Sequence, residues 1–222
     1  MPHVKEQVTQ ITQPANRQTG AHGSQTVSVE PLVALLDDET TLNALDEIFF
    51  SSSVRQHFND EGEMLIFRER WLGRYLRDHG EHAFAAIADG QLVGYVVGCL
   101  KNPNEIGGFE DITAYAALPD LVAQTPAHLH INVLAGWRSR GVGAHLIRHF
   151  AAHAAAHGCP AVHIITGRGG RNVGFYERNG FHTLFSGDAT ASPATRGLVF
   201  MARPTTLTLT GSRDGGAHSQ GV

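Results

Sequence analysis

A glycine-bearing segment near the middle of the chain, residues 138–144, has the residue types and spacing that hold an anion. It reads RSRGVGA and stands between a strand-like alternating run at 128–133 and a long amphipathic run at 141–157. A turn that opens a helix presents unpaired backbone N–H groups and the positive end of the helix dipole. Gly141 and Gly143 lack a Cβ, so an anion can approach the backbone closely. The segment therefore predicts a cradle for a phosphate or diphosphate group.

Two common phosphate-binding motifs do not fit this segment. The dinucleotide fingerprint requires G-x-G-x-x-G, but Leu146 stands where the third glycine is needed. The nucleotide-triphosphate loop requires G-x-x-x-x-G-K-[ST], and no such string occurs in the chain. The glycine-rich stretch at 167–172 lacks the same Lys-Ser/Thr ending. The spacing therefore disfavours a nucleotide-dependent enzyme.

Residues 138–143 instead resemble the [RQ]-x-x-G-x-[GA] signature of the GNAT superfamily, the acyl-CoA-dependent N-acyltransferases. A second stretch, NVGFYERNGF at 172–181, resembles the [FL]-Y-x-x-x-G-F ending of that family's second motif, at the separation that the family pattern requires. The string PAHLHIN at 126–132 looks closest to the acetyltransferase-like domain found attached to O-GlcNAcases. The resemblance implies an α/β fold with a twisted, mostly antiparallel sheet. Helices flank this sheet, which is splayed between its two central parallel strands.

The resemblance also implies acetyl-CoA as cosubstrate and no metal. The backbone around the glycine turn would hold the diphosphate, and an N–H at the splayed end of the central strand would polarise the thioester carbonyl. The arginines beside the turn would add charge-assisted contacts. The residues expected to contact the cofactor are Val133, Arg138, Ser139, Arg140, Gly141, Val142, Gly143, Ala144, Asn172 and Tyr176.

The family reaction is attack of an unprotonated amine on the thioester carbonyl. By resemblance, Tyr176 would protonate the departing thiolate, because a phenol is protonated at pH 7. His128 or His130 would accept the ammonium proton, since both lie on one face of the central strand and histidine titrates near pH ~6.5. Glu110 and Asp111 are rival bases or ammonium anchors, and Asn132 is a further acceptor-binding candidate.

The elements that must position these groups are readable from hydrophobic periodicity. Strands are expected at 26–32, 128–133, 161–166, 182–185 and 197–201, and Asp89-Gly90 predicts a tight hairpin between 82–88 and 91–100. Helices are expected after Asp37-Asp38, over 63–77, over 141–157 and from Asn172, its expected cap, to Gly180. The long connection at 101–126 is expected to be functional or mobile.

Composition bounds the remaining possibilities. The chain has 222 residues and a net charge of −4 with 17 Lys+Arg, which disfavours a nucleic-acid or anionic-membrane partner. We expect a disordered leader at 1–25, one acetyltransferase domain at 26–204 and a polar, Gly-rich tail at 205–222. No apolar run is long enough to span a membrane and no secretory signal is present, so a cytoplasmic location is expected.

Two further patterns are interpreted as structural features rather than as functional sites. Cys99 and Cys159 are expected to be buried thiols rather than a disulfide or metal site. Histidines recur every four residues along 145–157, which predicts a half-exposed helix flank more readily than a metal site.

The leading hypothesis is an N-acetyltransferase acting on a small amine or an exposed amino group. The alternative is a catalytically inactive pseudo-acetyltransferase that serves as an interaction or ligand-sensing module. The sequence names neither the acceptor nor the general base, and it leaves the acyl length open. Acyltransferases of this kind often pair, so a homodimer is left open too.

Overall fold

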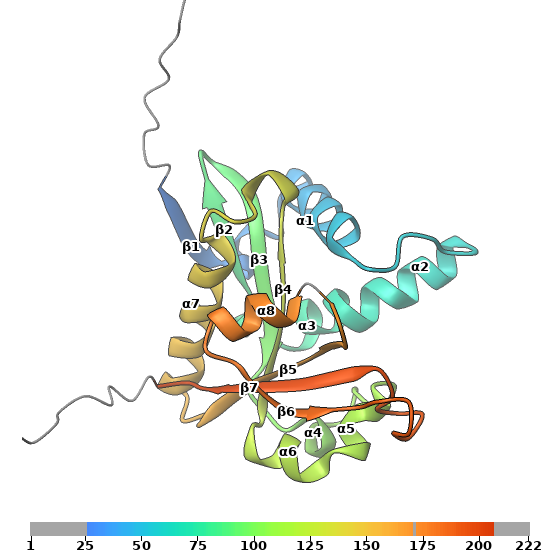
Figure 1. Ribbon diagram of the computed structural model, residues 1–222. Helices are drawn as coiled ribbons and strands as arrows, with labels where there is room; N and C mark the ends of the chain where they lie inside the picture. Colours follow the sequence, from blue (N-terminus) through green and yellow to red (C-terminus); the bar gives the residue numbers. More distant parts are fainter. Residues whose placement is uncertain (1–25, 171, 207–222) are drawn as a thin grey trace, which may run out of the picture.

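A seven-stranded sheet with helices on both faces organises the computed structural model, which describes residues 26–170 and 172–206 (Figure 1). The strands are β1 Val27–Pro31, β2 Phe84–Ala88, β3 Gln91–Cys99, β4 Ala127–Val133, β5 Ala161–Gly167, β6 His182–Ser186 and β7 Leu198–Pro204. Their order is β1-β2-β3-β4-β5-β7-β6. β4 and β5 run parallel, whereas every other neighbouring pair is antiparallel. This confirms the predicted mixed α/β fold.

The hairpin between β2 and β3 turns at the predicted dipeptide. Asp89 and Gly90 both have positive φ angles, 51° and 75°. Two consecutive positive φ angles characterise the tight turns whose twist matches that of the flanking strands. The Asp-Gly signal therefore marked both the position and the geometry of the turn.

One face of the sheet is covered by the helices that precede β4. They are η1 Leu32–Leu35, α1 Glu39–Ser52, α2 Glu61–Arg68, η2 Glu69–Gly73, α3 Arg74–Asp78, η3 Gly80–His82, α4 Pro103–Ile106, α5 Thr113–Ala117 and α6 Pro119–Gln124. Asp38 caps α1 by accepting hydrogen bonds from the N–H groups of Thr40 (3.2 Å) and Thr41 (3.1 Å). The predicted helix at 63–77 is real but contains a π-helical segment, η2, that periodicity did not indicate. We call this side the α1 face.

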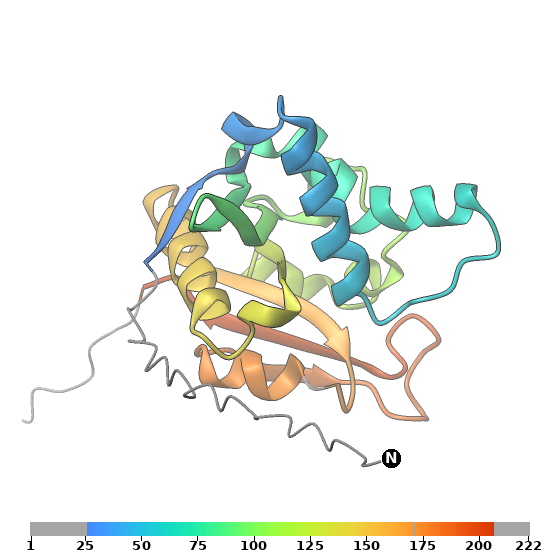
Figure 2. The ribbon, with the colours of Figure 1, turned by 90° about the horizontal axis from the view of Figure 1, so that it is seen from above.

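The opposite face carries α7 Val142–Ala156 and α8 Asn172–Arg178, with the short η4 Ala135–Trp137 before them. Figure 2 shows α7 on the other side of the sheet from α1 and α2. α8 ends where predicted, because Gly180 has φ 83° and the N–H of Phe181 reaches back to the carbonyl of Tyr176 (3.1 Å). We call this side the α7 face.

Each face has its own apolar core. The α7 face buries Val142, Leu146 and Phe150 against the sheet, and the α1 face buries Leu45, Phe49 and Tyr75. Cys99 and Cys159 are free and buried, as predicted. No helix among the described residues is long and apolar enough to cross a membrane.

The predicted domain limits are only partly visible. The expected leader, 1–25, and the tail from 207 onward lie outside the described residues. Thr205, assigned to the tail, is buried, and its hydroxyl donates to the carbonyl of Cys159 (2.6 Å). The packed part of the chain therefore continues past residue 204, because this bond ties the end of β7 to the start of β5.

Candidate active site

β4 and β5 separate almost as soon as they meet. The only paired positions are Ala127 with Val162 and His128 with His163, although β4 continues to Val133 and β5 to Gly167. Within the described residues, the later backbone groups of β4 that face β5 therefore have no strand beside them. The result is a gap in the middle of the sheet, open along the C-terminal halves of both strands. We call it the β4–β5 gap.

The register of β4 shows which backbone groups point into the gap. Leu134 donates its N–H to the carbonyl of Val93 on β3 (2.9 Å), so the N–H of Val133 must point the other way. The same alternation directs the backbone polar groups of Ile131 toward β5. The pairing of β4 with β3 is continuous, without a bulge. Val133 thus offers an N–H at the place that the sequence predicted.

The glycine turn lies beside the end of β4, because Gly143 packs near the Val133 side chain; it is exposed from Arg138 to Gly141, whereas Val142 and Gly143 are buried. Gly141 precedes α7 with φ 85° and ψ −7°, a conformation that favours glycine. The first intrahelical bond runs from the N–H of His145 to the carbonyl of Gly141 (2.9 Å). The N–H groups of Val142, Gly143 and Ala144 precede that bond and have no acceptor within the helix. This arrangement can hold an anion at the positive end of a 15-residue helix.

Gly143 has a different reason for lacking a side chain than the one predicted. A Cβ built on it would meet the Phe175 ring at 2.8 Å, so the missing side chain lets α7 pack against α8. An approaching anion would meet the exposed Gly141 instead, where nothing lies within 4 Å of a built Cβ. Gly143 can still contribute its backbone N–H.

The arginines flanking the turn already have contacts inside the protein. Arg138 donates from Nε to the carbonyl of Val133 (3.0 Å) and from Nη2 to Ser52 Oγ (3.0 Å), which joins the end of β4 to α1. The guanidinium of Arg140 lies over the Trp137 ring at 5.2 Å. Both residues and Ser139, which has φ 61°, are exposed. Arg138 therefore braces the gap as well as adding positive charge there.

Tyr176 lies on α8 against the α7-face core, and its side chain is 8% exposed. Its ring packs at 5.2 Å from Phe181 and 5.3 Å from Phe175. Its hydroxyl has no hydrogen-bond partner among the residues that the structure describes. Burial raises the pKa of Tyr176, so the phenol stays protonated at neutral pH and can act as a proton donor. Asn172 is the exposed first residue of α8, and its capping position falls at residue 171, outside the described part of the chain.

His130 lies on the α1 face of β4, half-buried among aromatic residues. Its Nε2 is 3.0 Å from the Tyr75 hydroxyl, and its ring is 4.9 Å from that of Trp71. Burial, with the charge of nearby Arg74 as a smaller cause, lowers the pKa of His130 to about 3. The ring is therefore neutral at physiological pH. It can accept a hydrogen bond from an amine, but it is a weak base.

His128 is enclosed more completely and does not reach the gap's surface. It is 1% exposed, with rings of Phe109 at 5.0 Å, His163 at 5.4 Å and Tyr115 at 5.5 Å. Neither ring nitrogen has a hydrogen-bond partner within the described part of the chain. Burial holds the pKa of His128 well below its ordinary value. Because no amine can reach a ring so enclosed, its position disfavours the predicted base role and favours a role in packing.

The three acceptor-binding candidates are dispersed. Asn132 shares the face of His130 and donates to the Tyr95 hydroxyl (2.7 Å). Glu110 is exposed and accepts from the N–H of Gly108 (3.1 Å). Asp111 accepts from both Arg74 nitrogens (2.8 Å each) and from Arg70 Nε (2.6 Å), and these partners lower its pKa. A carboxylate held by two guanidinium groups is poorly placed to take a proton, so Asp111 fits a structural role better than the predicted base role.

A pocket of about 300 Å³ opens on the α1 face beside the end of β5. Its lining is mixed, with an aromatic ring, an ion pair and aliphatic groups. It comprises Arg70, Trp71, Asp111, Ile112, Thr113, Ala114, Ile165, Thr166, Gly167, Ala194 and Leu198. Trp71 links this pocket, which we call the β5 pocket, to His130. Arg70 and Trp71 come from η2, and π-helical segments are frequent at functional sites.

Sequence reasoning missed Trp71, Tyr75 and the two arginines that hold Asp111. Trp71 and Tyr75 were predicted only as an apolar helical stripe. Arg70 and Arg74 belong to no recognisable motif, because Asp111, the residue that they bind, lies 41 and 37 positions away from them in the chain. The one available signal was Tyr75. Its position on the apolar side of the predicted helix indicates a buried side chain, and a buried tyrosine hydroxyl needs a hydrogen-bond partner.

Metal ligation finds no geometric support in the described segments, where no group of three or more His, Cys, Asp or Glu side chains could hold an ion. The histidine stripe of α7 is partly buried against β2 and η3. His153 Nε2 lies 3.0 Å from His82 Nδ1, and the His149 ring packs 4.5 Å from that of Phe84.

The part of the sequence that forms the gap and the glycine turn matches a known protein family. The acetyltransferase (GNAT) family model matches residues 42–181, more than half of the chain. This protein belongs to the GNAT acetyltransferase family. The prediction of an N-acetyltransferase is thereby confirmed, and the matched range includes both motifs and the strands that separate. The finer resemblance to O-GlcNAcase-associated domains stays a prediction.

Solved structures agree with this GNAT assignment. A protein named SsHAT is 25% identical, with a TM-score of 0.61, over 82% of this chain and 100% of that one. PaiA N-acetyltransferase from Thermoplasma acidophilum, solved in complex with coenzyme A, is 14% identical, with a TM-score of 0.53, over 81% and 99%. The ribosomal-protein-S18-alanine N-acetyltransferase of Escherichia coli is 15% identical, with a TM-score of 0.50, over 82% and 96%. The last two share the fold with this chain.

Proposed function

We propose that this GNAT protein transfers an acetyl group from acetyl-CoA to a primary amine by direct attack in a ternary complex. The amine belongs to a small molecule or to an exposed amino group. One observation carries the proposal: β4 and β5 part after two paired positions, which leaves the Val133 N–H pointing into a gap beside an open glycine turn. The solved complex of a relative with coenzyme A supports this choice of cosubstrate.

Binding of the donor falls to backbone groups. The N–H groups from Arg140 to Ala144 hold the diphosphate at the start of α7, and the exposed Arg138 and Arg140 add charge. The pantetheine arm lies along the free edge of β4 in the β4–β5 gap. There it pairs with the backbone polar groups of Ile131 much as a strand would, while the Val133 N–H stays free for the thioester. The Val133 N–H then meets the thioester oxygen, where negative charge develops.

The acceptor approaches from the α1 face through the β5 pocket. Its nitrogen attacks the thioester carbonyl carbon, a C–N bond forms and the C–S bond breaks. Tyr176 gives its proton to the leaving thiolate, the nitrogen releases its surplus proton to solvent water, and the Tyr176 phenolate takes a proton back from solvent, so that the N-acetylated product and the free thiol form with the enzyme restored. His130, neutral at physiological pH, accepts a hydrogen bond from the amine and orients it. Because the pKa of His130 is about 3, the amine must reach the site already deprotonated.

A two-step measurement tests this proposal. In the first step, acetyl-CoA at a hundred times its Kd should stabilise the protein by about 2.7 kcal/mol in a thermal melt. In the second, free thiol release is followed across a panel of primary amines. Release that depends on an amine supports the proposal. Absence of stabilisation contradicts it.

The same measurement separates the proposal from the inactive pseudo-acetyltransferase. A ligand-sensing module of this fold would be stabilised by acetyl-CoA yet release no thiol with any amine. The presence of a tyrosine at position 176, where the family motif carries one, favours an active enzyme, because a sensor has no use for a proton donor at the leaving group.

A further inference from the structure

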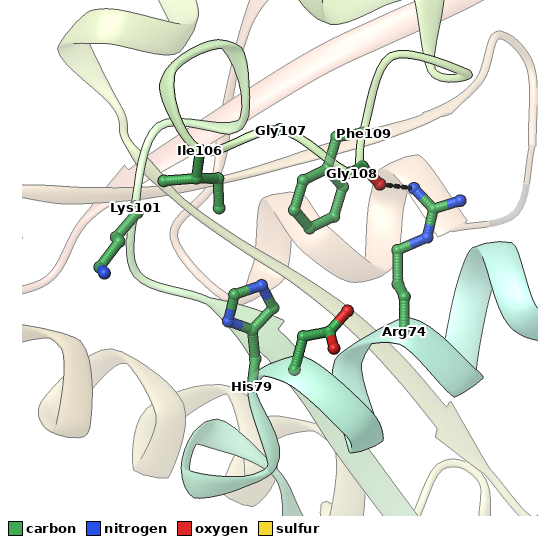
Figure 3. Close-up of a pocket in the computed structure, with 8 residues that line it drawn as sticks. Arg74, His79, Lys101, Ile106, Gly107, Gly108 and Phe109 are labelled. Carbon is green, nitrogen blue, oxygen red and sulfur yellow. Dashed lines mark hydrogen bonds between the residues drawn. The ribbon is translucent and has the colours of Figure 1, made fainter.

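A second pocket, of about 380 Å³, lies on the α1 face between α3 and the α4–α5 connection (Figure 3). We call it the α3 pocket. Its lining combines charged groups with apolar ones and comprises Arg74, Asp78, His79, Lys101, Ile106, Gly107, Gly108 and Phe109. Lys101 follows the C-terminal end of β3, which pairs with the N-terminal end of β4. The pocket is therefore at the opposite end of β4 from the gap.

Most charges around the α3 pocket belong to small ion-pair clusters. Arg74 shares Asp111 with Arg70, Arg77 pairs with both Asp78 and Glu69, and the Glu110 carboxylate accepts from the N–H of Gly108 at the pocket's edge. Burial lowers the pKa of His79, so its ring is neutral at physiological pH. Lys101 is exposed and has no ion-pair partner among the described residues. The site therefore suits a ligand with one negative charge better than a dianion.

The middle of the α3 pocket is apolar. Figure 3 shows Lys101 and Arg74 at opposite ends, with Ile106 and the rings of His79 and Phe109 between them. The His79 and Phe109 rings are stacked, with centroids 6.0 Å apart and planes inclined by 16°. Arg74 lies over the Phe109 ring at 5.3 Å, which fixes that ring from the far side. Phe109 itself is 3% exposed, so the surface open to a flat or branched hydrocarbon group comes from the half-buried Ile106 and His79.

We infer that the α3 pocket binds a small monocarboxylate with an apolar body. Its carboxylate pairs with Lys101 and its hydrocarbon part packs on Ile106 and on the His79 ring, which Phe109 supports from below the surface. This site is distinct from the β5 pocket proposed for the acceptor. The Arg74–Asp111 ion pair forms the wall between the two, because Arg74 lines one pocket and Asp111 lines the other.

Fluorine NMR with 4-fluorobenzoate as the probe tests this inference directly. We expect saturable line broadening that weakens as salt is added, since an exposed lysine makes the main charged contact. The neutral 4-fluorobenzamide should bind about tenfold more weakly, because it cannot form the charge-assisted bond. Equal binding of acid and amide, or the absence of saturable broadening, would overturn the inference.

Variants at Lys101 assign the binding to this pocket. Lys101→Ala should weaken 4-fluorobenzoate by about tenfold, and Lys101→Arg should largely preserve binding. Arg148→Ala is the matched control, because it removes an exposed positive charge from α7 on the opposite face of the sheet. An unchanged melting temperature shows that Lys101→Ala remains folded. Equal effects of Lys101→Ala and Arg148→Ala would contradict the site, as would displacement of the probe by equimolar inorganic phosphate.

A kinetic measurement separates this pocket from the acceptor site and rests on the proposed acetyltransferase activity. Benzoate should not compete with the amine, because the two occupy separate pockets. Competitive inhibition against the amine would overturn the assignment of a second site. If the protein released no thiol at all, the acetyltransferase proposal would fail, and the NMR binding experiment would still decide the carboxylate site.

Discussion

Tyr176 and His130 illustrate how burial sets the chemistry of single residues in this protein. Both side chains are ordinary titratable groups whose pKa is shifted by desolvation. For a phenol, which is protonated at neutral pH in any case, this shift weakens the group as an acid. For an imidazole it removes the proton and lowers basicity. The same physical cause therefore makes Tyr176 a weaker proton donor and His130 a weaker base in the free protein.

Replacing Tyr176 by Phe tests the proton donor. We expect turnover to fall by about 10²- to 10⁴-fold, the usual contribution of a general acid, with coenzyme A affinity unchanged. Steady-state thiol release and calorimetric titration with coenzyme A measure the two quantities. The melting temperature should hardly change, since the hydroxyl has no partner among the described residues. Unchanged turnover would remove Tyr176 from the mechanism.

The pH profile of a His130→Gln variant tests the role of His130. Because the pKa of His130 is about 3, the ring of the parent protein is neutral throughout the pH range of the profile, and the glutamine of the variant does not titrate. We therefore expect kcat/KM for the amine to fall while the shape of its profile between pH 5 and 8 stays the same. Glutamine can still bond to the Tyr75 hydroxyl, so the fold should hold. An inflection near pH 6–7 that disappears in the variant would show that His130 titrates there as the base.

At the scale of elements, the site depends on how a strand end, a turn and two helices meet. The gap exists because β4 stays paired with β3 and β5 stays paired with β7 on their outer edges, while the two strands part from each other after two paired positions. α8 then packs its Phe175 ring into the space left by Gly143 on α7. The two glycines of the turn therefore have different roles. Gly141 adopts a left-handed backbone conformation, and Gly143 leaves room for the packing of α7 against α8.

Gly141→Glu should abolish coenzyme A binding, because the new side chain adds bulk and a negative charge where the diphosphate is expected. Gly158→Glu is a matched control at the other end of α7. Its φ of 78° resembles the 85° of Gly141, and neither built Cβ has a neighbour within 4 Å. Both variants carry a similar backbone cost, so a difference in calorimetric affinity reports the anion site. Equal affinities would show that the site has been misplaced.

Gly143→Ala should destabilise the protein by about 1–3 kcal/mol, because its Cβ would lie 2.8 Å from Phe175 Cζ. Denaturant unfolding measures the loss. In a Phe175→Leu background, where the opposing ring is replaced by a smaller side chain, adding Gly143→Ala should cost less stability than it does in the parent protein. Simple additivity of the two single changes would argue against this contact.

For the whole molecule, buried histidines make the fold sensitive to acid. Burial holds the pKa of His163 at about 4, and that of His128 well below its ordinary value. Unfolded histidine titrates near pH 6.5, so the unfolded chain binds more protons than the native one between about pH 6.5 and 4. The free energy of unfolding therefore falls as pH falls through that window. His163 alone would account for about 3 kcal/mol.

His128→Leu should reduce this acid sensitivity. The variant removes two ring nitrogens that have no hydrogen-bond partner in residues 26–170 and 172–206, and it puts an apolar side chain among aromatic rings. Denaturant unfolding at pH 7 and pH 5 should show a smaller loss of stability than in the parent protein. Replacement of the exposed His57 by Leu serves as the control and should leave the loss unchanged. An equal pH dependence in His128→Leu would contradict the argument.

The sequence by itself determined the fold family, the glycine turn and the central strand, because these follow from local pattern. Alternation defined β4, the Asp-Gly pair defined the hairpin, and the two motifs at 138–143 and 172–181 defined the superfamily. Each depends on residues that are close in the chain, where backbone conformation and periodicity leave a direct signal.

Only the tertiary structure decided which candidate side chains can do chemistry. His128 and His130 are equivalent in the sequence, yet one is sealed among rings and the other contacts Trp71 beside the β5 pocket. In the sequence Asp111 looks like a free carboxylate, but in the folded protein Arg70 and Arg74 both donate hydrogen bonds to it. Burial and ion pairing come from segments far apart in the chain, so local pattern does not encode them, and they set both the protonation state and the accessibility of a residue.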